Sequence, residues 1–409
     1  MTTVVRPVSA EELPAFLEAL STGFLERPDV AKVAEELKPL WDLQRTLAAF
    51  DGDRICGTFR SWASELTVPG GARLPASAVT AVTVMPTHRR RGVLRSMMTA
   101  EKDAVNARGE AVGVLYASEY PIYGRFGYGS ATRSATWTVD ALGTGFHAPA
   151  TGSLEVVTPG QAAVEAMKGV FDAWRLQQTG EISRPGYRWE YDLGLRPTAW
   201  GKDWKGFLVL HRDPSGTVDG YVRYRTEEKW EKRQPRNVVL VDELHALSDD
   251  AYRSLWRFLV EIDLVSTIKA EWRSSNERLP WLLTNARAAV ASDVGEAVWV
   301  RLFDVPRALM ARTYERAASI VLEVIDPALA DGRVNLLLDA SPDGTTCAPT
   351  DRGADLTVGV AALGAAYLGG SRLRDAVLAG GADEHRAGAL SEADALLRTA
   401  DEPWCSTFF

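Results

Sequence analysis

Cysteine and histidine are scarce in this 409-residue chain. Its three cysteines, Cys56, Cys347 and Cys405, stand far apart, and of its five histidines only His88 lies near a motif. An odd number of widely spaced cysteines predicts neither a disulfide framework nor a zinc site. We therefore expect no metal, no catalytic histidine and a reducing, cytoplasmic compartment.

The chain also lacks a long apolar run and an excess of basic charge. The alanine-rich stretch 359–369 is broken by glycines and falls well short of the roughly 20 residues that a membrane helix needs. The first residues lack the pattern of a secretory signal. Lysine and arginine number 46 against 54 aspartates and glutamates, a net charge of -8. We expect no membrane span and no nucleic-acid partner, whereas a cationic substrate is permitted.

The composition is that of a globular protein with more than one core. Apolar residues make up 46% of the chain and charged residues 24%, which are ordinary values for folded proteins. A chain of this length exceeds what a single hydrophobic core supports, so we expect two or three domains.

Hydrophobic periodicity predicts a mixed sheet in the first part of the chain. Ser9 and Glu12 resemble a capping box for a helix that runs to about Leu20. The further elements expected here are helices over 30–40 and 92–109 and strands over 45–50, 54–63, 74–83, 111–117 and 131–139. We expect these strands to form one sheet that closes near residue 150.

A second set of elements begins after Gly152 and repeats the order of the first. It comprises helices over 158–178 and 249–263 and strands over 207–212, 219–227, 237–247, 268–272 and 297–303. From about Val305, alternating apolar residues predict strands over 320–324 and 332–338, followed by helices over 357–368 and 371–379.

The segment 79–95 has the pattern of a phosphate-binding loop. A β-branched run predicts a strand up to Val84, Pro86 ends its pairing, and an apolar helical stretch follows Gly92. The free N–H groups and positive dipole end of that helix favour an anion, and a glycine lets the anion approach the backbone. Four arginines add positive charge, although a solvated basic face is the alternative interpretation: Arg89, Arg90, Arg91 and Arg95.

This loop resembles the pyrophosphate loop of the GNAT superfamily of N-acetyltransferases, which reads Arg/Gln-x-x-Gly-x-Gly/Ala. Arg89, Gly92 and Leu94 hold its three places. Together with 88–95, the segment 118–129, Ser-Glu-Tyr-Pro-Ile-Tyr-Gly-Arg-Phe-Gly-Tyr-Gly, is similar to the Eis (enhanced intracellular survival) family of actinobacterial acetyltransferases, in which leucine is normal at the last place. That family ends in an aromatic residue, as this chain does with Phe409.

The resemblance implies an α/β fold with mixed α+β sheets, built as two GNAT-like domains in tandem and a sterol carrier protein-like α+β domain. The expected boundaries are 1–150 for the catalytic domain, 151–304 for the second and 305–409 for the third, which ends in the catalytic C-terminus. Carboxylates occupy the place of the second domain's phosphate loop and would repel a pyrophosphate, so we expect that copy to be degenerate: Asp242, Glu243, Asp249 and Asp250. The family also implies a homohexamer.

By resemblance, Tyr123 protonates the coenzyme thiolate and the carboxylate of Phe409 is the general base. A phenol with a pKa near 10 stays protonated at neutral pH and can still donate to a sulfur anion. A C-terminal carboxylate has a pKa of only about 3.3 to 3.7, so it must be buried to become a useful base, and the apolar chain end favours this. The alternatives are that Tyr123 packs beside Phe126 and Tyr128 and that the chain end is frayed.

The resemblance assigns acetyl-CoA as cosubstrate and direct transfer to an amine in a ternary complex. No cysteine or serine stands in a nucleophile arrangement, so no covalent acyl-enzyme is required. The residues expected to bind acetyl-CoA are Val82, Thr83, Val84, Arg90, Arg91, Gly92, Val93, Leu94, Arg95, Ser118 and Glu119.

The acceptor is expected to be an aminoglycoside, a polyamine or a lysine side chain. Carboxylates and aromatic rings attract ammonium groups, and the candidates are Phe24, Glu26, Trp41, Asp401 and Glu402. For each of them a packing or solvated role is an equal alternative. Two other functions stay open at this point: a non-catalytic acetyl-CoA sensor, and a carrier of an apolar ligand through the C-terminal domain.

Overall fold

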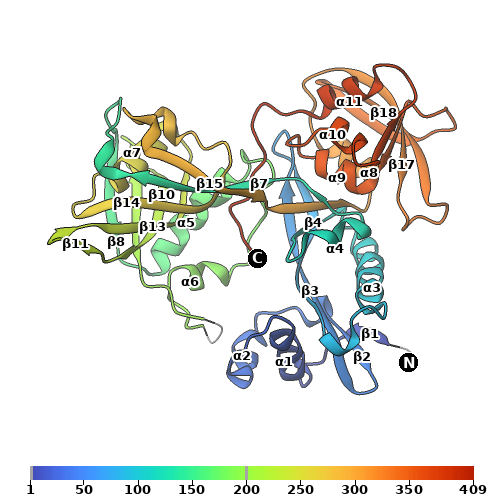
Figure 1. The fold of residues 1–409 in the computed structure, drawn as a ribbon, viewed down its shortest axis with the longest axis horizontal. Helices are drawn as coiled ribbons and strands as arrows, with labels where there is room; N and C mark the ends of the chain where they lie inside the picture. Colours follow the sequence, from blue (N-terminus) through green and yellow to red (C-terminus); the bar gives the residue numbers. More distant parts are fainter. Residues whose placement is uncertain (1–2, 199–200) are drawn as a thin grey trace.

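The computed structural model describes residues 3–198 and 201–409, in which two seven-stranded sheets and one five-stranded sheet are flanked by helices (Figure 1). A further pair of short strands, β11 (Trp230–Glu231) and β12 (Gln234–Pro235), forms a hairpin. Within the described ranges, no helix is long and apolar enough to cross a membrane.

The first sheet has the spatial order β1, β2, β3, β4, β5, β16, β6. Its strands are β1 (Val4–Pro7), β2 (Thr46–Asp51), β3 (Arg54–Thr67), β4 (Arg73–Val84), β5 (Val112–Tyr116), β16 (Val298–Leu302) and β6 (Gly129–Ser130). Only β4 and β5 run parallel, and the helix α3 (Val93–Arg108) connects them. A parallel pair requires such a crossover, so the loop before α3 lies at the end of β4.

Helices cover both faces of this sheet. On β2, Leu47 and Ala49 share a core with α3, whereas Ala48 and Phe50 share a core with α1 (Leu13–Gly23) and α2 (Val30–Leu37). Because successive side chains of a strand point to opposite faces, α3 lies on one face and α1 with α2 on the other.

The helix α1 begins later than the capping box predicts. The Ser9 N–H donates to the Glu12 carboxylate at 2.9 Å, but the same carboxylate pairs with Arg6 at 2.6 Å and no side chain caps the helix. The helix therefore starts at Leu13, and it runs to Gly23, past the predicted end at Leu20.

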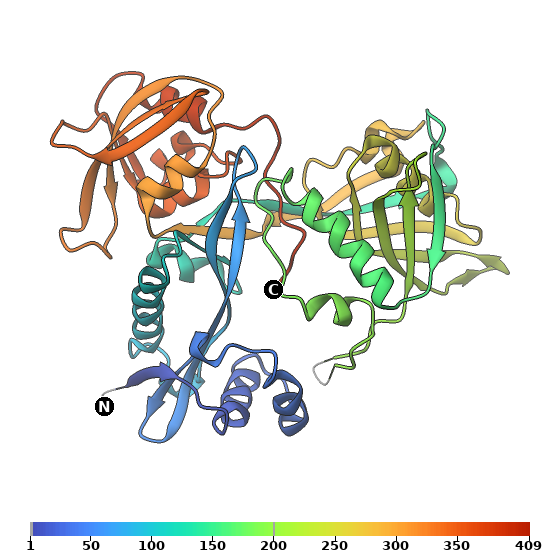
Figure 2. The same cartoon turned by 180° about the vertical axis from the view of Figure 1, so that it is seen from behind.

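The second sheet has the order β15, β7, β14, β13, β10, β9, β8. Its strands are β15 (Ala289–Glu296), β7 (Arg133–Asp140), β14 (Val265–Ser274), β13 (Asn237–Ala246), β10 (Val218–Glu227), β9 (Phe207–Arg212) and β8 (Ser153–Val157). The helices α5 (Gln161–Trp174), α6 (Arg188–Asp192) and α7 (Asp249–Val260) accompany it (Figure 2). Asp249 and Asp250 occupy the first turn of α7, the end at which a phosphate would otherwise be favoured.

The two seven-stranded sheets exchange a strand, which corrects two expectations. The predicted strand 131–139 is β7, which pairs with β14 and β15 of the second sheet. The predicted strand 297–303 is β16, which lies between β5 and β6 of the first sheet. Backbone pairing with a distant partner decides this placement, and strand pattern alone carries no information about it.

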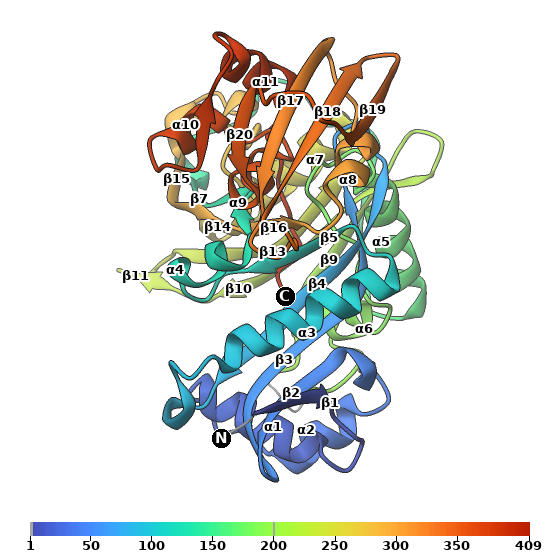
Figure 3. The ribbon, with the colours of Figure 1, turned by 90° about the vertical axis from the view of Figure 1, so that its right-hand side faces the viewer.

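The third sheet, in the order β19, β18, β17, β20, β21, lies at the end of the molecule opposite α1 and α2 (Figure 3). Its strands are β17 (Ala318–Ile325), β18 (Arg333–Ser341), β19 (Gly344–Pro349), β20 (Leu356–Gly359) and β21 (Ala382–Glu384), with helices α8 (Val305–Ala311), α9 (Val360–Ala366), α10 (Leu373–Val377) and α11 (Ala389–Leu397). The predicted helix 357–368 is wrong at its start, because Leu356–Gly359 pairs in parallel with β17 before α9 begins.

The first and third sheets share one hydrophobic core. Leu66 and Val300 of the first sheet belong to the same buried cluster as Leu322 of the third sheet and Leu363 of the adjoining helix α9. A Cβ on Gly129 would lie 1.9 Å from the carbonyl oxygen of Ala361, so backbone meets backbone at this contact. After α11, residues 398–409 form the tail, which runs to a chain end between the first and second sheets (Figures 1 and 2).

Candidate active site

A cavity of about 1190 Å³ opens beside the end of β4 and the start of α3. We call it the β4 cavity. It brings together residues that the sequence assigned to acetyl-CoA and to proton donation: Val82, Thr83, Val84, Arg90, Gly92, Val93, Leu94, Arg95, Ser118, Glu119 and Tyr123. Arg91 is the exception, because it is exposed and does not line the cavity.

One wall of the β4 cavity is a strand edge without a partner. β4 pairs with β5 only from Ala76 to Val79, so among the described residues the β5-facing edge of 80–84 has no strand partner. A bulge causes this separation: Ala81 has φ +53°, and the register with β3 shifts at the same place. Free N–H and C=O groups on such an edge can pair with the amides of an extended ligand.

The start of α3 provides an anion site at one end of the β4 cavity. Gly92 is the N-cap residue with φ +83°, a left-handed conformation that glycine adopts without strain. A Cβ there would meet nothing within 4 Å, so the backbone is open to a ligand. Within the described residues, no ion pair or hydrogen bond engages the side chains of the loop's four arginines, of which Arg89, Arg90 and Arg95 line the cavity. This arrangement fits a diphosphate.

Tyr123 is packed in a buried position that lines the β4 cavity. It ends the short helix α4 (Tyr120–Tyr123), is only 4% exposed and meets the ring of Tyr128 edge-on at 6.3 Å. Burial raises the pKa of Tyr123, while a hydrogen bond with Ser118 opposes that rise. The phenol therefore stays protonated at neutral pH, as a proton donor must.

Two of the three glycines in 124–129, Gly127 and Gly129, pack closely against the rest of the protein, whereas a Cβ on Gly124 would meet nothing within 4 Å. A Cβ on Gly127 would lie 1.4 Å from Nη1 of Arg301, and Gly129 touches α9. Arg301 makes a buried ion pair with Asp326 at 2.7 Å, and both residues line the β4 cavity. The loop that follows β17 of the third sheet therefore forms part of the cavity wall. No local sequence motif predicts this contact.

The chain end lies beside the last residue of β5. The ring of Phe409 is 4.8 Å from Trp62 and 5.2 Å from Tyr116, and Phe408 is 4.8 Å from Trp272. Ser118 and Glu119 follow Tyr116 after one intervening residue and line the β4 cavity. The aromatic terminus is therefore packed near the point where β4 and β5 separate. Sequence reasoning did not find Trp62, Tyr116 or Trp272, because their roles depend on the tail that they contact.

The predicted acceptor residues are dispersed. Phe24 lines the β4 cavity, and Trp41 packs edge-on against Phe16 and lies 4.1 Å below the guanidinium of Arg60. Glu26 follows α1, where its N–H donates to the Ser21 carbonyl at 2.8 Å.

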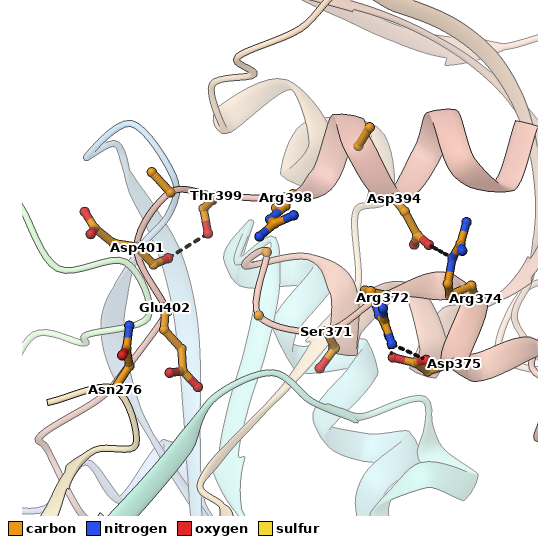
Figure 4. Close-up of a pocket in the computed structure, with 14 residues that line it drawn as sticks. Asn276, Ser371, Arg372, Arg374, Asp375, Asp394, Arg398, Thr399, Asp401 and Glu402 are labelled. Carbon is orange, nitrogen blue, oxygen red and sulfur yellow. Dashed lines mark hydrogen bonds and ion pairs between the residues drawn. The ribbon is translucent and has the colours of Figure 1, made fainter.

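Asp401 and Glu402 do not line the β4 cavity but a different pocket of about 540 Å³ (Figure 4). There the Glu402 carboxylate accepts from the hydroxyl of Ser275 at 2.6 Å. The role of these two carboxylates in binding the acceptor stays a prediction.

Three family models match the chain. They describe an acetyltransferase (GNAT) domain over residues 4–131, a second acetyltransferase (GNAT) domain over 180–302 and a sterol carrier protein domain over 305–406. A protein named as an uncharacterised N-acetyltransferase from Streptomyces griseus is 42% identical over 100% of both chains. The N-acetyltransferase Eis of Mycobacterium tuberculosis is 36% identical over 78% of this chain and 77% of its own. The crystal structure of Eis1 from Mycobacterium abscessus has a TM-score of 0.86 at 36% identity and covers 99% of this chain and 100% of its own.

The cavity and these matches define an N-acetyltransferase of the GNAT class, with acetyl-CoA as cosubstrate. The chain belongs to the Eis family of these enzymes. The expected architecture of two GNAT domains and a sterol carrier protein-like domain is confirmed. The exact boundaries 1–150, 151–304 and 305–409 stay a prediction, and the exchange of β7 and β16 means that no single cut separates the two sheets.

Gly23→Ala is expected to weaken acetyl-CoA binding about tenfold. A Cβ at Gly23 would lie 1.9 Å from Oγ1 of Thr83, so either the free edge of β4 or the end of α1 must shift, an overpacking worth about 1 to 3 kcal/mol. Isothermal titration calorimetry measures the change. The control is Gly169→Ala within α5, where a Cβ meets nothing within 4 Å; it should leave acetyl-CoA affinity unchanged, and an equal loss there would contradict the explanation.

Arg90→Glu and Arg91→Glu form a matched pair, because they change the net charge equally. Arg90 lines the β4 cavity and Arg91 does not. We expect Arg90→Glu to weaken acetyl-CoA binding about 100-fold through the loss of a charge-assisted contact and added repulsion, and Arg91→Glu about threefold or less at physiological salt. Equal effects by calorimetry would mean that the arginines act only through a general positive field.

Proposed function

We propose that this enzyme transfers acetyl from acetyl-CoA directly to an amine of an aminoglycoside, a polyamine or a lysine side chain, in a ternary complex. The observation that carries the proposal is the β4 cavity, which joins an anion-binding loop, an unpaired strand edge and the buried phenol of Tyr123. The net charge of -8 suits a cationic acceptor.

In the proposed mechanism, the C-terminal carboxylate of Phe409 and the phenol of Tyr123 move the protons. The carboxylate of Phe409 removes a proton from the acceptor amine, whose nitrogen then attacks the thioester carbonyl. As the C–N bond forms and the C–S bond breaks, Tyr123 donates its phenolic proton to the departing thiolate. The unpaired edge of β4 and the start of α3 hold the cosubstrate in place during this transfer.

The test is thiol release from acetyl-CoA against a panel of aminoglycosides, polyamines and lysine peptides, with product masses recorded. Release coupled to one added acetyl group per thiol supports the proposal. Tight acetyl-CoA binding without any acetylated product would instead support the sensor. Binding of an apolar ligand, without turnover of any amine, would support the carrier.

We also propose that the enzyme works in the cytoplasm as a homohexamer. The family resemblance is the basis for the assembly, and the three buried, unpaired cysteines are compatible with a reducing compartment. Multi-angle light scattering tests the assembly: six chain masses are expected, and a monomer at micromolar concentration would refute it.

A further inference from the structure

Groups of the second sheet and of residues 179–188 form hydrogen bonds with several residues of the tail. The Trp404 N–H donates to the Thr179 carbonyl and its indole N–H donates to the Trp272 carbonyl, both at 2.9 Å. Arg188 Nη1 donates to the Phe408 carbonyl at 2.5 Å. These contacts leave little freedom to the residues that lead to Phe409.

A buried carboxylate and a buried guanidinium form the centre of this attachment. Glu181 is 0% exposed and accepts hydrogen bonds from the N–H and the hydroxyl of Ser406, both at 2.7 Å. Nε of Arg184 donates to the Thr407 hydroxyl at 2.8 Å, and Nη2 pairs with Glu243 at 2.5 Å. Buried charges destabilise a protein unless they are paired and hydrogen-bonded. The polar groups of the tail complete that pairing here, so the tail has one favourable position.

The same segment is fixed to the first sheet, which contains the β4 cavity. The Thr67 N–H at the end of β3 donates to the Glu181 carbonyl at 2.9 Å, and the Gly180 N–H donates to the Thr67 carbonyl at 2.8 Å. The attachment therefore sets the tail relative to Trp62 and Tyr116, on which Phe409 packs. A rigid connection of this kind is needed where a reactive group must be held to within a fraction of an ångström.

We propose that the segment 179–188 is a clamp for the tail, and that Glu181, Arg184 and Arg188 are positioning residues for the carboxylate of Phe409. The inference rests on the proposed role of that carboxylate as general base. In this proposal the second GNAT-like domain, which lacks a phosphate loop, also takes part in the reaction. It holds the general base, and the first domain holds acetyl-CoA.

Glu181→Gln and Arg188→Ala test the clamp with little risk to the fold. The first keeps the shape of the side chain, and the second removes a side chain that is 28% exposed. The control is Arg225→Ala, which breaks an ion pair with Asp242 in the same sheet, 2.6 Å long, without touching the tail. Three readouts are needed: kcat, the Kd of acetyl-CoA, and the rate at which carboxypeptidase A removes Phe409, followed by mass spectrometry.

Each clamp variant is expected to lower kcat about 10- to 100-fold, since small misplacements of a reacting group have effects of this size. The Kd of acetyl-CoA should stay within about twofold, and carboxypeptidase should remove Phe409 faster than from the parent or the control. In a chain that already lacks Phe409, the same substitutions should lower kcat no further.

Other results would overturn the clamp. Parent-like kcat together with parent-like trimming would show that Glu181 and Arg188 do not position the tail. An equal further loss of kcat in the chain without Phe409 would show a merely structural role. If deletion of Phe409 itself left kcat unchanged, the general-base role would fall and with it the catalytic part of the inference, whereas trimming would still measure whether the segment holds the tail.

Discussion

Deletion of Phe409, or addition of one glycine after it, is expected to lower kcat for acetylation about 10²- to 10⁴-fold while acetyl-CoA affinity stays unchanged. The expected loss is that of the proposed general base, the C-terminal carboxylate, whose position depends on the length of the tail. The ring of Phe409 packs against Trp62 and Tyr116, so one residue more or less moves the carboxylate by about 3.3 Å. The phosphate loop lies on another part of the first sheet and is untouched. Stopped-time acetylation assays and calorimetry measure the two quantities separately.

The control for the tail keeps the carboxylate in place. Phe409→Trp retains an aromatic ring and the same chain length, so it should preserve most of kcat. A glycine-extended chain as active as the parent would contradict the assignment of the C-terminal carboxylate, and the general base would then have to be sought elsewhere in the site.

Tyr123→Phe is expected to lower kcat by a similar factor, about 10²- to 10⁴-fold, again with little change in acetyl-CoA affinity. The substitution removes only the phenolic hydroxyl, and the ring can keep its edge-on contact with Tyr128. Tyr120→Phe is the matched control: Tyr120 lies on the same short helix but is 64% exposed and packs on Trp299. If the Tyr123→Phe variant kept the kcat of the parent, Tyr123 would have only a packing role and no role in proton donation.

The pH profile gives a second test of Tyr123. Because burial raises the pKa of this phenol above its ordinary value near 10, it remains protonated throughout the neutral and mildly alkaline range. No loss of kcat from Tyr123 ionisation is expected below pH 10, and the decline should appear only above it. An alkaline limb below that value that disappears in Tyr123→Phe would contradict the direction of the pKa shift.

Local patterns predicted the part of the site that depends on neighbouring residues. The β-branched run, Pro86 and Gly92 specify a strand, its end and the start of α3 within a short segment, and the structure has β4 up to Val84 and α3 from Val93. The roles of these residues stay predictions, but their assembly in one cavity follows from elements adjacent in the chain. The helix expected at 357–368 failed where a strand partner, β17, overrode the local preference of Leu356–Gly359.

Properties that require distant contacts were not available from the sequence. Asp401 and Glu402 were grouped with Phe24 as acceptor residues, but Phe24 lines the β4 cavity and the two carboxylates line another pocket. Arg91 was grouped with its neighbours, but the turn of the loop excludes it from the cavity. The attachment of Ser406 to Glu181 joins residues more than 200 positions apart.

The sequence by itself determined many of the helices and strands, the strand, turn and helix start over 79–95 and the resemblance to a family, because period, turn residues and helix starts are set by interactions within a few residues. Only the tertiary structure decided that β7 and β16 exchange sheets, that the third sheet closes one wall of the cavity, and that the tail ends beside β5. The physical reason is that strand pairing and burial are gained between distant segments, and many pairings satisfy the same local pattern until the whole chain is packed.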